Sequence, residues 1–165
     1  MSSQALHIRP LTKQDQALLW DMLYHAIYVA PGQPPFARDI INAPDIWCYA
    51  AEWMIQPCDA GFAAEVDNKP VGAVWLRCWT GEQKGYGYVD ASTPELTIAL
   101  LPGYRGKGIG TALLRRCLRE AEKKHVAVSL SVSTPNPAKK LYLREGFVVV
   151  REDDGGSVTM LKKLA

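Results

Sequence analysis

The sequence predicts a fold of the α+β or mixed α/β class, built around one central sheet. Two observations lead to this class. The N-terminal half is rich in strand-like segments and carries two helix-like ones, whereas strand-like and helix-like segments alternate from residue 95 onward. The chain has 165 residues, which is the size of one domain, so we expect a single domain over residues 1–165.

The first elements follow from apolar periodicity and from helix-stop residues. Residues 5–11 alternate as a strand does, and Thr12 then offers an N-cap for a helix that ends near Ile27. Prolines and a glycine within residues 29–36 predict a surface loop. Apolar and aromatic residues at helical spacing predict a second helix over residues 44–55, which the proline that follows would stop.

Two further strands precede a long irregular segment. Residues 61–66 and 71–79 are apolar runs joined by a polar turn, which predicts an antiparallel hairpin. Residues 80–94 are rich in glycine and polar side chains, and we expect no regular element there. We interpret this segment as a candidate functional loop.

The second half of the chain alternates between strands and helices. The predicted order is strand 95–101, a glycine turn, helix 111–124, strand 126–132, helix 136–145, strand 147–150 and strand 158–164.

Composition and charge narrow the function classes. Hydrophobic residues make up 48% of the chain, charged residues 22%, and the net charge is only +2, which does not suggest a nucleic-acid partner. No apolar run reaches the roughly 18 residues of a membrane helix, and the N-terminus lacks the apolar region of a signal peptide. We therefore expect a soluble, cytoplasmic protein with neither a nucleic-acid nor a membrane partner.

The cysteines and histidines predict no metal site. Cys48, Cys58, Cys78 and Cys117 form no C-x-x-C pair, and the three histidines lie far from them in sequence.

The glycine turn RGKGIG, residues 105–110, stands where a strand meets a helix. Glycine reaches positive φ freely and has no Cβ, so successive glycines let backbone N–H groups point at one ligand. The N-terminus of a helix adds unpaired N–H groups and a positive dipole. With Arg105 and Lys107 beside it, the turn predicts an anion site, most naturally for phosphate.

Spacing separates three phosphate-binding patterns. A P-loop requires lysine where Ile109 stands, and a dinucleotide fingerprint requires glycine where Thr111 stands. The third pattern, [RQ]-x-x-G-x-[GA], is matched in full by Arg105, Gly108 and Gly110.

At this point the sequence resembles a known family. The segment PELTIALLPGYRGKGIGTALL resembles the acyl-CoA-binding segment of the GNAT superfamily of N-acetyltransferases, and NPAKKLYLREGF resembles the next motif of that family at the expected distance. LHIRPLTKQD is similar to the family's opening strand and helix. The resemblance implies a GNAT-type fold with one mostly antiparallel sheet of about six to seven strands flanked by about four helices.

The resemblance also implies acetyl-CoA as the acyl donor and names the residues that would bind it. In the family, backbone amides of the glycine turn hold the pyrophosphate and a strand backbone pairs with the pantetheine arm. Asn136 has a second explanation, because Asn before Pro137 is a favoured helix start. The implied cofactor-binding residues are Ile98, Ala99, Leu100, Arg105, Gly106, Lys107, Gly108, Ile109, Gly110 and Asn136.

Two catalytic residues are implied in the same way. Tyr142 stands where the family often places the acid that protonates the departing CoA thiolate, and a tyrosine with an ordinary pKa of about 10 carries its proton at neutral pH. Glu95 stands near the family's frequent base, with Asp90 and Tyr88 as alternatives. No cysteine lies in a motif typical of an acyl-enzyme, so we expect direct attack in a ternary complex.

The resulting expectation is an acetyl-CoA-dependent N-acetyltransferase that acts on a primary amine. The acceptor, a small molecule or a peptide, would meet residues 28–39 and 80–92, where Arg38, Tyr86, Tyr88 and Asp90 could orient it. The sequence also allows two other functions. One is a non-catalytic acyl-CoA-binding module, and the other is a phosphate- or nucleotide-binding enzyme that uses the turn for another cofactor. Because members of this superfamily are often dimers, we also expect that the protein can form a homodimer.

Overall fold

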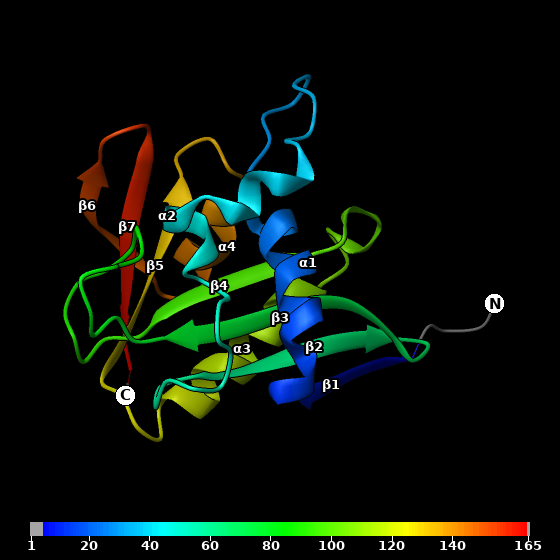
Figure 1. Cartoon of the computed structure of the whole chain (residues 1–165), viewed down its shortest axis with the longest axis horizontal. Helices are drawn as coiled ribbons and strands as arrows, with labels where there is room; N and C mark the ends of the chain where they lie inside the picture. Colours follow the sequence, from blue (N-terminus) through cyan, green and yellow to red (C-terminus); the bar gives the residue numbers. More distant parts are fainter. Residues whose placement is uncertain (1–4, 165) are drawn as a thin grey trace.

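One seven-stranded sheet organises the protein. The structure is a computed structural model that describes residues 5–164, and its strands follow the order β1-β2-β3-β4-β5-β7-β6 (Figure 1). Every neighbouring pair is antiparallel except β4 and β5, which are parallel. The predicted α+β class with a mostly antiparallel sheet is therefore confirmed. The strands are β1 (Leu6–Pro10), β2 (Ala60–Val66), β3 (Lys69–Arg77), β4 (Glu95–Leu100), β5 (Ala127–Ser133), β6 (Val148–Asp153) and β7 (Ser157–Lys163).

Helices cover both faces of the sheet and create two buried clusters. In Figure 1, α1 (Gln16–Ala26) lies in front of β3 and β4, and α3 (Ile109–Ala121) lies behind them. The α4 helix (Ala138–Arg144) packs into the same cluster as α3, and α2 (Pro44–Trp47) lies on the side of α1. None of the helices described within residues 5–164 combines the length and the apolar character that crossing a membrane requires.

The sequence predicts the start of the first helical segment correctly. Thr12 caps a short 3-10 turn, Lys13–Asp15, that leads directly into α1. The Thr12 hydroxyl accepts from the N–H of Gln14 at 3.3 Å, and the carboxylate of Asp15 accepts from the N–H of Thr12 at 2.7 Å. This reciprocal arrangement is a capping box, and it satisfies N–H groups that the first turn leaves unpaired.

The predicted helix over residues 44–55 is wrong beyond Trp47. Only Pro44–Trp47 is helical, and turns follow in which Glu52 and Met54 have positive φ. Distant side chains take the backbone groups that a continuing helix would need. Arg77 donates to the carbonyls of Cys48 and Glu52, at 2.8 and 3.1 Å. Tertiary contacts therefore override a helical periodicity that is real in the sequence.

A buried ion pair and a disulfide hold this turn segment against β3. Both side chains of the Arg77–Asp59 pair are nearly inaccessible, at 6% and 0% exposed, and their closest atoms are 3.0 Å apart. The neighbouring residues Cys58 and Cys78 form a disulfide. The spacing of the cysteines did not predict this bond, because the pairing depends on the register of the β2–β3 hairpin.

Candidate active site

The strands β4 and β5 part immediately after they meet. They share the pair Glu95–Ser129, where the N–H of Ser129 donates to the carbonyl of Pro94 at 3.0 Å, and the described residues contain no further pair between them. In Figure 1, β4 runs along β3 whereas β5 runs with β7 toward α4. The edge of β4 beyond Glu95 that faces β5 therefore has no paired strand.

The ladder between β3 and β4 decides which residues present that free edge. The N–H of Leu101 donates to the carbonyl of Val71, which stands directly opposite it, at 2.9 Å. Because hydrogen-bonded pairs alternate along an antiparallel ladder, Ala99 directs its N–H and carbonyl toward Ala73. The backbones of Ile98 and Leu100 point the other way. Of the three strand residues predicted to meet the pantetheine arm, Ile98 thus has main-chain groups without a strand partner. Leu100 has a free N–H, whereas its carbonyl accepts from the guanidinium of Arg105 at 3.2 Å.

The glycine turn forms an open concave strip of backbone. Gly106 and Gly108 have φ of +74° and +85°, and a Cβ built on either residue would meet nothing within 4 Å. Within the described chain, the N–H groups of residues 106–111 donate to no backbone or side-chain acceptor. The α3 helix starts at Ile109, so its dipole adds positive potential at the same point. A phosphate cradle requires features of this kind, and phosphate binding here stays a prediction.

The two basic residues of the turn have different surroundings. The guanidinium of Arg105 donates to the carbonyls of Leu100 and His25, each at 3.2 Å, and so ties the turn to β4 and to the last turn of α1. Lys107 is exposed, with its ammonium 5.5 Å from the ring centre of Tyr104. Arg105 therefore braces the turn, whereas Lys107 is available to an anionic ligand.

Asn136 caps α4, as its sequence context predicted. Its side-chain oxygen accepts from the N–H of Ala138 at 2.9 Å, and Pro137 already has helical backbone angles. The cap uses the carbonyl oxygen of the amide and leaves the amide NH₂ group for a ligand. Capping and cofactor contact are thus compatible.

Tyr142 is buried between α4 and the sheet. It is 7% exposed, packs edge-to-face against Phe147, and shares one buried cluster with Leu96 of β4 and Leu130 of β5. Burial raises the pKa of Tyr142 well above its ordinary value. The hydroxyl therefore keeps its proton throughout the neutral range and is available as a donor.

Glu95 is a buried carboxyl with both oxygens occupied. It is 3% exposed, and its oxygens accept hydrogen bonds from the hydroxyl of Tyr49 at 2.5 Å and from the indole N–H of Trp79 at 2.9 Å. Burial raises the pKa of Glu95 from 4.5 to about 7, against the opposing effect of these two bonds. A carboxyl that titrates near neutral pH suits a general base.

The two alternative bases have less suitable surroundings. Asp90 is exposed and accepts from the hydroxyl and the N–H of Ser92, each at 2.9 Å; these contacts hold its pKa below the ordinary value. Tyr88 packs under the ammonium of Lys84, which lies 4.3 Å from the ring centre. Both residues stay predictions, and the geometry favours Glu95.

The two loops predicted to meet an acceptor lie on the same side as α1. Tyr28 reaches across to the β5–α4 turn, with its hydroxyl 3.5 Å from the carbonyl of Pro135. Arg38 pairs with Asp21 and stacks over Tyr24 at 4.6 Å. The hydroxyl of Tyr86 donates to Asp45, whose segment also carries Tyr49. The loops are thus tied to α1 and to the buried Glu95 site.

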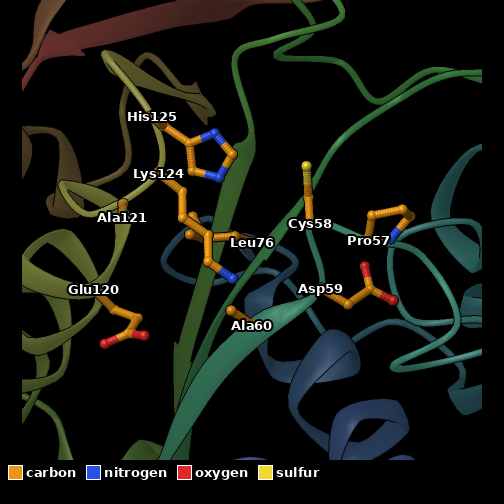
Figure 2. Close-up of a pocket in the computed structure, with 9 residues that line it drawn as sticks. All are labelled: Pro57, Cys58, Asp59, Ala60, Leu76, Glu120, Ala121, Lys124 and His125. Carbon is orange, nitrogen blue, oxygen red and sulfur yellow. The ribbon is translucent and has the colours of Figure 1, made fainter.

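A separate small pocket lies at the far end of the β2–β3 hairpin. Its volume is about 100 Å³, and none of the predicted site residues lines it. Figure 2 shows its lining side chains, Pro57, Cys58, Asp59, Ala60, Leu76, Glu120, Ala121, Lys124 and His125. Within residues 5–164, no cluster of histidine, cysteine, aspartate and glutamate is arranged to hold a metal ion.

Sequence reasoning did not identify Tyr49 and Trp79 as site residues. Both are indeed buried, at 9% and 6% exposed, but their polar atoms converge on Glu95. The available signal was chemical, because a buried tyrosine or tryptophan usually finds a partner for its O–H or N–H.

Comparisons with known proteins point to one family. A family model described as an acetyltransferase (GNAT) domain matches residues 58–149, which include the glycine turn and most of the sheet. An uncharacterized N-acetyltransferase of Methanocaldococcus jannaschii is 32% identical over 117 residues, which is 68% of this chain and 50% of that relative. The match therefore spans half the length of the archaeal protein.

Solved structures share the fold over nearly the whole chain. YncA of Salmonella typhimurium, solved with its cofactor acetyl-CoA, is 20% identical, with a TM-score of 0.70 over 98% of this chain and 95% of that one. The PaiA N-acetyltransferase of Thermoplasma acidophilum, in complex with coenzyme A, is 21% identical, with a TM-score of 0.66 over 96% and 99%.

Proposed function

This chain belongs to the GNAT family of acetyltransferases, and on that premise we propose that it transfers an acetyl group from acetyl-CoA to a primary amine by direct attack in a ternary complex. The observation that carries the proposal is the parting of β4 from β5 beside the glycine turn. Backbone groups of β4 that lack a strand partner and unpaired N–H groups at the start of α3 would together bind the cofactor.

The residues of the turn fit the phosphate groups of CoA. The strip from Gly106 to Thr111 supplies unpaired N–H donors, and the open space above Gly106 and Gly108 lets an anion approach the backbone. Lys107 adds a mobile positive charge, while Arg105 keeps the strip in position. Bound acetyl-CoA supplies a thioester that a neutral amine can attack.

The backbone of Ile98 and the N–H of Leu100 fit an extended arm that carries amide groups. A ligand added at this edge gains main-chain hydrogen bonds of the kind a neighbouring strand would make. Side-chain identity matters little for such contacts, which explains why ordinary apolar residues occupy the strand. Asn136, which follows β5, keeps its NH₂ group for a further contact.

Glu95 accepts the proton that the amine must lose. A protonated amine cannot attack a thioester, so a base or a proton-accepting path is needed. At pH values above about 7 the carboxyl of Glu95 is ionised and ready to take a proton. The proton reaches the carboxyl directly or through a water that the carboxyl holds.

Tyr142 donates to the sulfur of the leaving group. Its hydroxyl is protonated at working pH because burial raises its pKa. Donation stabilises the negative charge that develops on sulfur as the thioester bond breaks.

The acceptor binds between the loops on the α1 side. Residues 28–39 and 80–92 contribute aromatic and polar side chains there, with Tyr86 and Asp45 joined by a hydrogen bond. We assign a small-molecule or peptide amine to this site.

Calorimetry and a thiol-release assay test the proposal together. CoA should bind more tightly than ATP or NAD, and acetyl-CoA should release free thiol when amino acids, polyamines, aminoglycosides and peptides are offered in turn. Tight CoA binding without amine-dependent thiol release would support a non-catalytic acyl-CoA-binding module instead. ATP or NAD binding tighter than CoA would contradict the assignment of the turn.

A further inference from the structure

Tyr49 joins three parts of the molecule at Glu95. Its hydroxyl donates to one oxygen of Glu95 at 2.5 Å and accepts from the backbone N–H of Tyr86 at 2.6 Å. Its own carbonyl accepts from the indole N–H of Trp75 at 2.9 Å, which fixes the segment that carries Tyr49 to β3. The hydroxyl therefore has a defined place between the carboxyl and the loop above it.

Trp79 completes the surroundings of the carboxyl. Its indole N–H donates to the second oxygen of Glu95 at 2.9 Å, and its ring packs edge-to-face against Tyr49 with centres 5.2 Å apart. An indole N–H can only donate, whereas an ionised carboxyl can only accept. A protonated carboxyl would lose the bond from Trp79 or require Tyr49 to accept rather than donate, so these two donors favour the ionised form and oppose the effect of burial.

The loop of residues 80–93 closes over the same group. A Cβ on Gly85 would lie 2.6 Å from the hydroxyl of Tyr49, and one on Gly87 would lie 3.0 Å from the carboxyl carbon of Glu95. The hydroxyl of Ser129 holds the carbonyl of Gly87 at 2.7 Å. Only glycine fits at these positions, and bulk water is kept away from the carboxyl.

We propose that Tyr49 and Trp79 are positioning residues that hold Glu95 ionised and in one orientation, and thereby set the pH at which amine transfer begins. The second half of this statement rests on the proposed function, in which Glu95 is the base. The first half is a property of the free protein and can be tested without any substrate.

The pKa of Glu95 is set by burial, which raises it, and by nearby donors and charges, which lower it. Burial raises the pKa of Glu95, and the hydrogen bonds from Tyr49 and Trp79 are the largest opposing effects. The backbone of Gly87 and the positive charge of Arg151 on β6 also lower it. Cys48 faces the same site with its thiol protonated, because burial raises its pKa to about 11. Removing one donor therefore raises the pKa of Glu95 further.

Two variants, each lacking one donor, test the proposal. Tyr49→Phe removes the hydroxyl, and Trp79→Phe removes the indole N–H while keeping an aromatic ring. Infrared difference spectra against Glu95→Gln follow the carboxylate of Glu95 during a pH titration of the free protein. Each variant should titrate about one pH unit higher than the unmodified protein. The acid limb of the kcat/KM profile should move by the same amount.

Tyr24→Phe is the matched control. The hydroxyl of Tyr24 donates to the carbonyl of Phe36 at 2.6 Å, so this variant also loses one tyrosine hydrogen bond, here an exposed one, and does not touch Glu95. Neither the titration nor the rate profile should move. Thermal unfolding checks that each variant is folded. If Trp79→Phe does not fold, the titration of Tyr49→Phe alone tests the positioning role.

The outcomes separate this proposal from the proposed function. An unchanged titration of Glu95 in folded Tyr49→Phe overturns the positioning role, whatever the enzyme acetylates. A titration that moves while the rate profile stays fixed overturns the link between Glu95 and the rate. If no amine is acetylated even by the unmodified protein, the proposed function fails, but the infrared titration still decides how Glu95 is held.

Discussion

Glu95 and Ser129 form the residue pair at which β4 and β5 meet, and the two strands separate directly beyond it. The same two residues also seat the loop of residues 80–93, because Ser129 holds the carbonyl of Gly87 and the backbone of Gly87 approaches Glu95. The proposed base therefore stands where the free backbone edge begins. This placement links cofactor binding and proton transfer through one short stretch of β4.

The phosphate cradle can be tested at Gly108. Alanine at φ +85° is strained by about 1 kcal/mol, and its methyl group would occupy the open space that an anion needs. We predict that Gly108→Ala lowers the affinity for CoA about tenfold or more in calorimetry, because charge-assisted hydrogen bonds to the backbone are lost.

Gly155 provides a matched control for that substitution. It has φ of +86° and equally open surroundings, but lies in the turn between β6 and β7. Gly155→Ala should lower the melting temperature as much as Gly108→Ala does and leave CoA affinity unchanged. Equal affinities in the two variants would argue against the cradle.

Substitution of Tyr142 should affect catalysis without affecting stability. Its hydroxyl has no hydrogen-bond partner within residues 5–164, and burial alone accounts for the rise in its pKa. Tyr142→Phe should therefore unfold at nearly the same temperature as the unmodified protein, but show a kcat about 100-fold lower with little change in the KM for acetyl-CoA. An unchanged kcat would rule out the hydroxyl as the acid.

The buried carboxylate of Glu95 should lower the free energy of unfolding at high pH. Its folded-state pKa of about 7 lies above the ordinary 4.5, so the folded state binds the proton more tightly than the unfolded state does. The stabilisation from this group is complete below about pH 4.5 and is lost as the pH rises through about 7, a change of about 3 kcal/mol. Glu95→Gln should thus be inactive yet more stable than the unmodified protein at pH 8.

Urea denaturation at two pH values checks this sign. The stability gained by Glu95→Gln should shrink between pH 8 and pH 5. A variant that is less stable at pH 8 than the unmodified protein would mean that the carboxylate itself holds the loop in place.

The Arg77–Asp59 pair should matter for the fold far more than an exposed pair does. Arg77→Met leaves a buried carboxylate without its partner, which should lower the free energy of unfolding by about 3–5 kcal/mol. Arg115→Met, which breaks an exposed pair with Glu145, should change it little. Similar losses in urea denaturation would contradict the role of Arg77 in fixing residues 48–59.

Local patterns predicted most of the fold because they reflect local physics. The alternation in β1, the cap at Thr12 and the apolar face of α3 depend on neighbours within a few residues. The false helix after Trp47 had the right periodicity, but Arg77, a side chain far along the chain, takes its carbonyls. Such a competition is invisible until the register of β3 is known.

In the candidate site, too, the features formed by consecutive residues could be predicted from the sequence, whereas those formed by distant residues could not. The glycine turn carries its chemistry in consecutive residues, so spacing alone distinguished it from other phosphate loops. The surroundings of Glu95 come from Tyr49, Trp79 and Gly87, which only the folded sheet brings together. Burial of Tyr142 and the bracing role of Arg105 likewise depend on packing between α4, α1 and the sheet.

Transfer of an isotopically labelled acetyl group tests whether this protein is an acetyltransferase. The protein is incubated with labelled acetyl-CoA and a panel of primary amines, and mass spectrometry follows the label while thiol release is recorded. We predict that the label appears on at least one amine at the rate of thiol release, and that Tyr142→Phe slows both equally. If CoA binds but no amine gains label above the enzyme-free rate, the account of this protein as an acetyltransferase is contradicted.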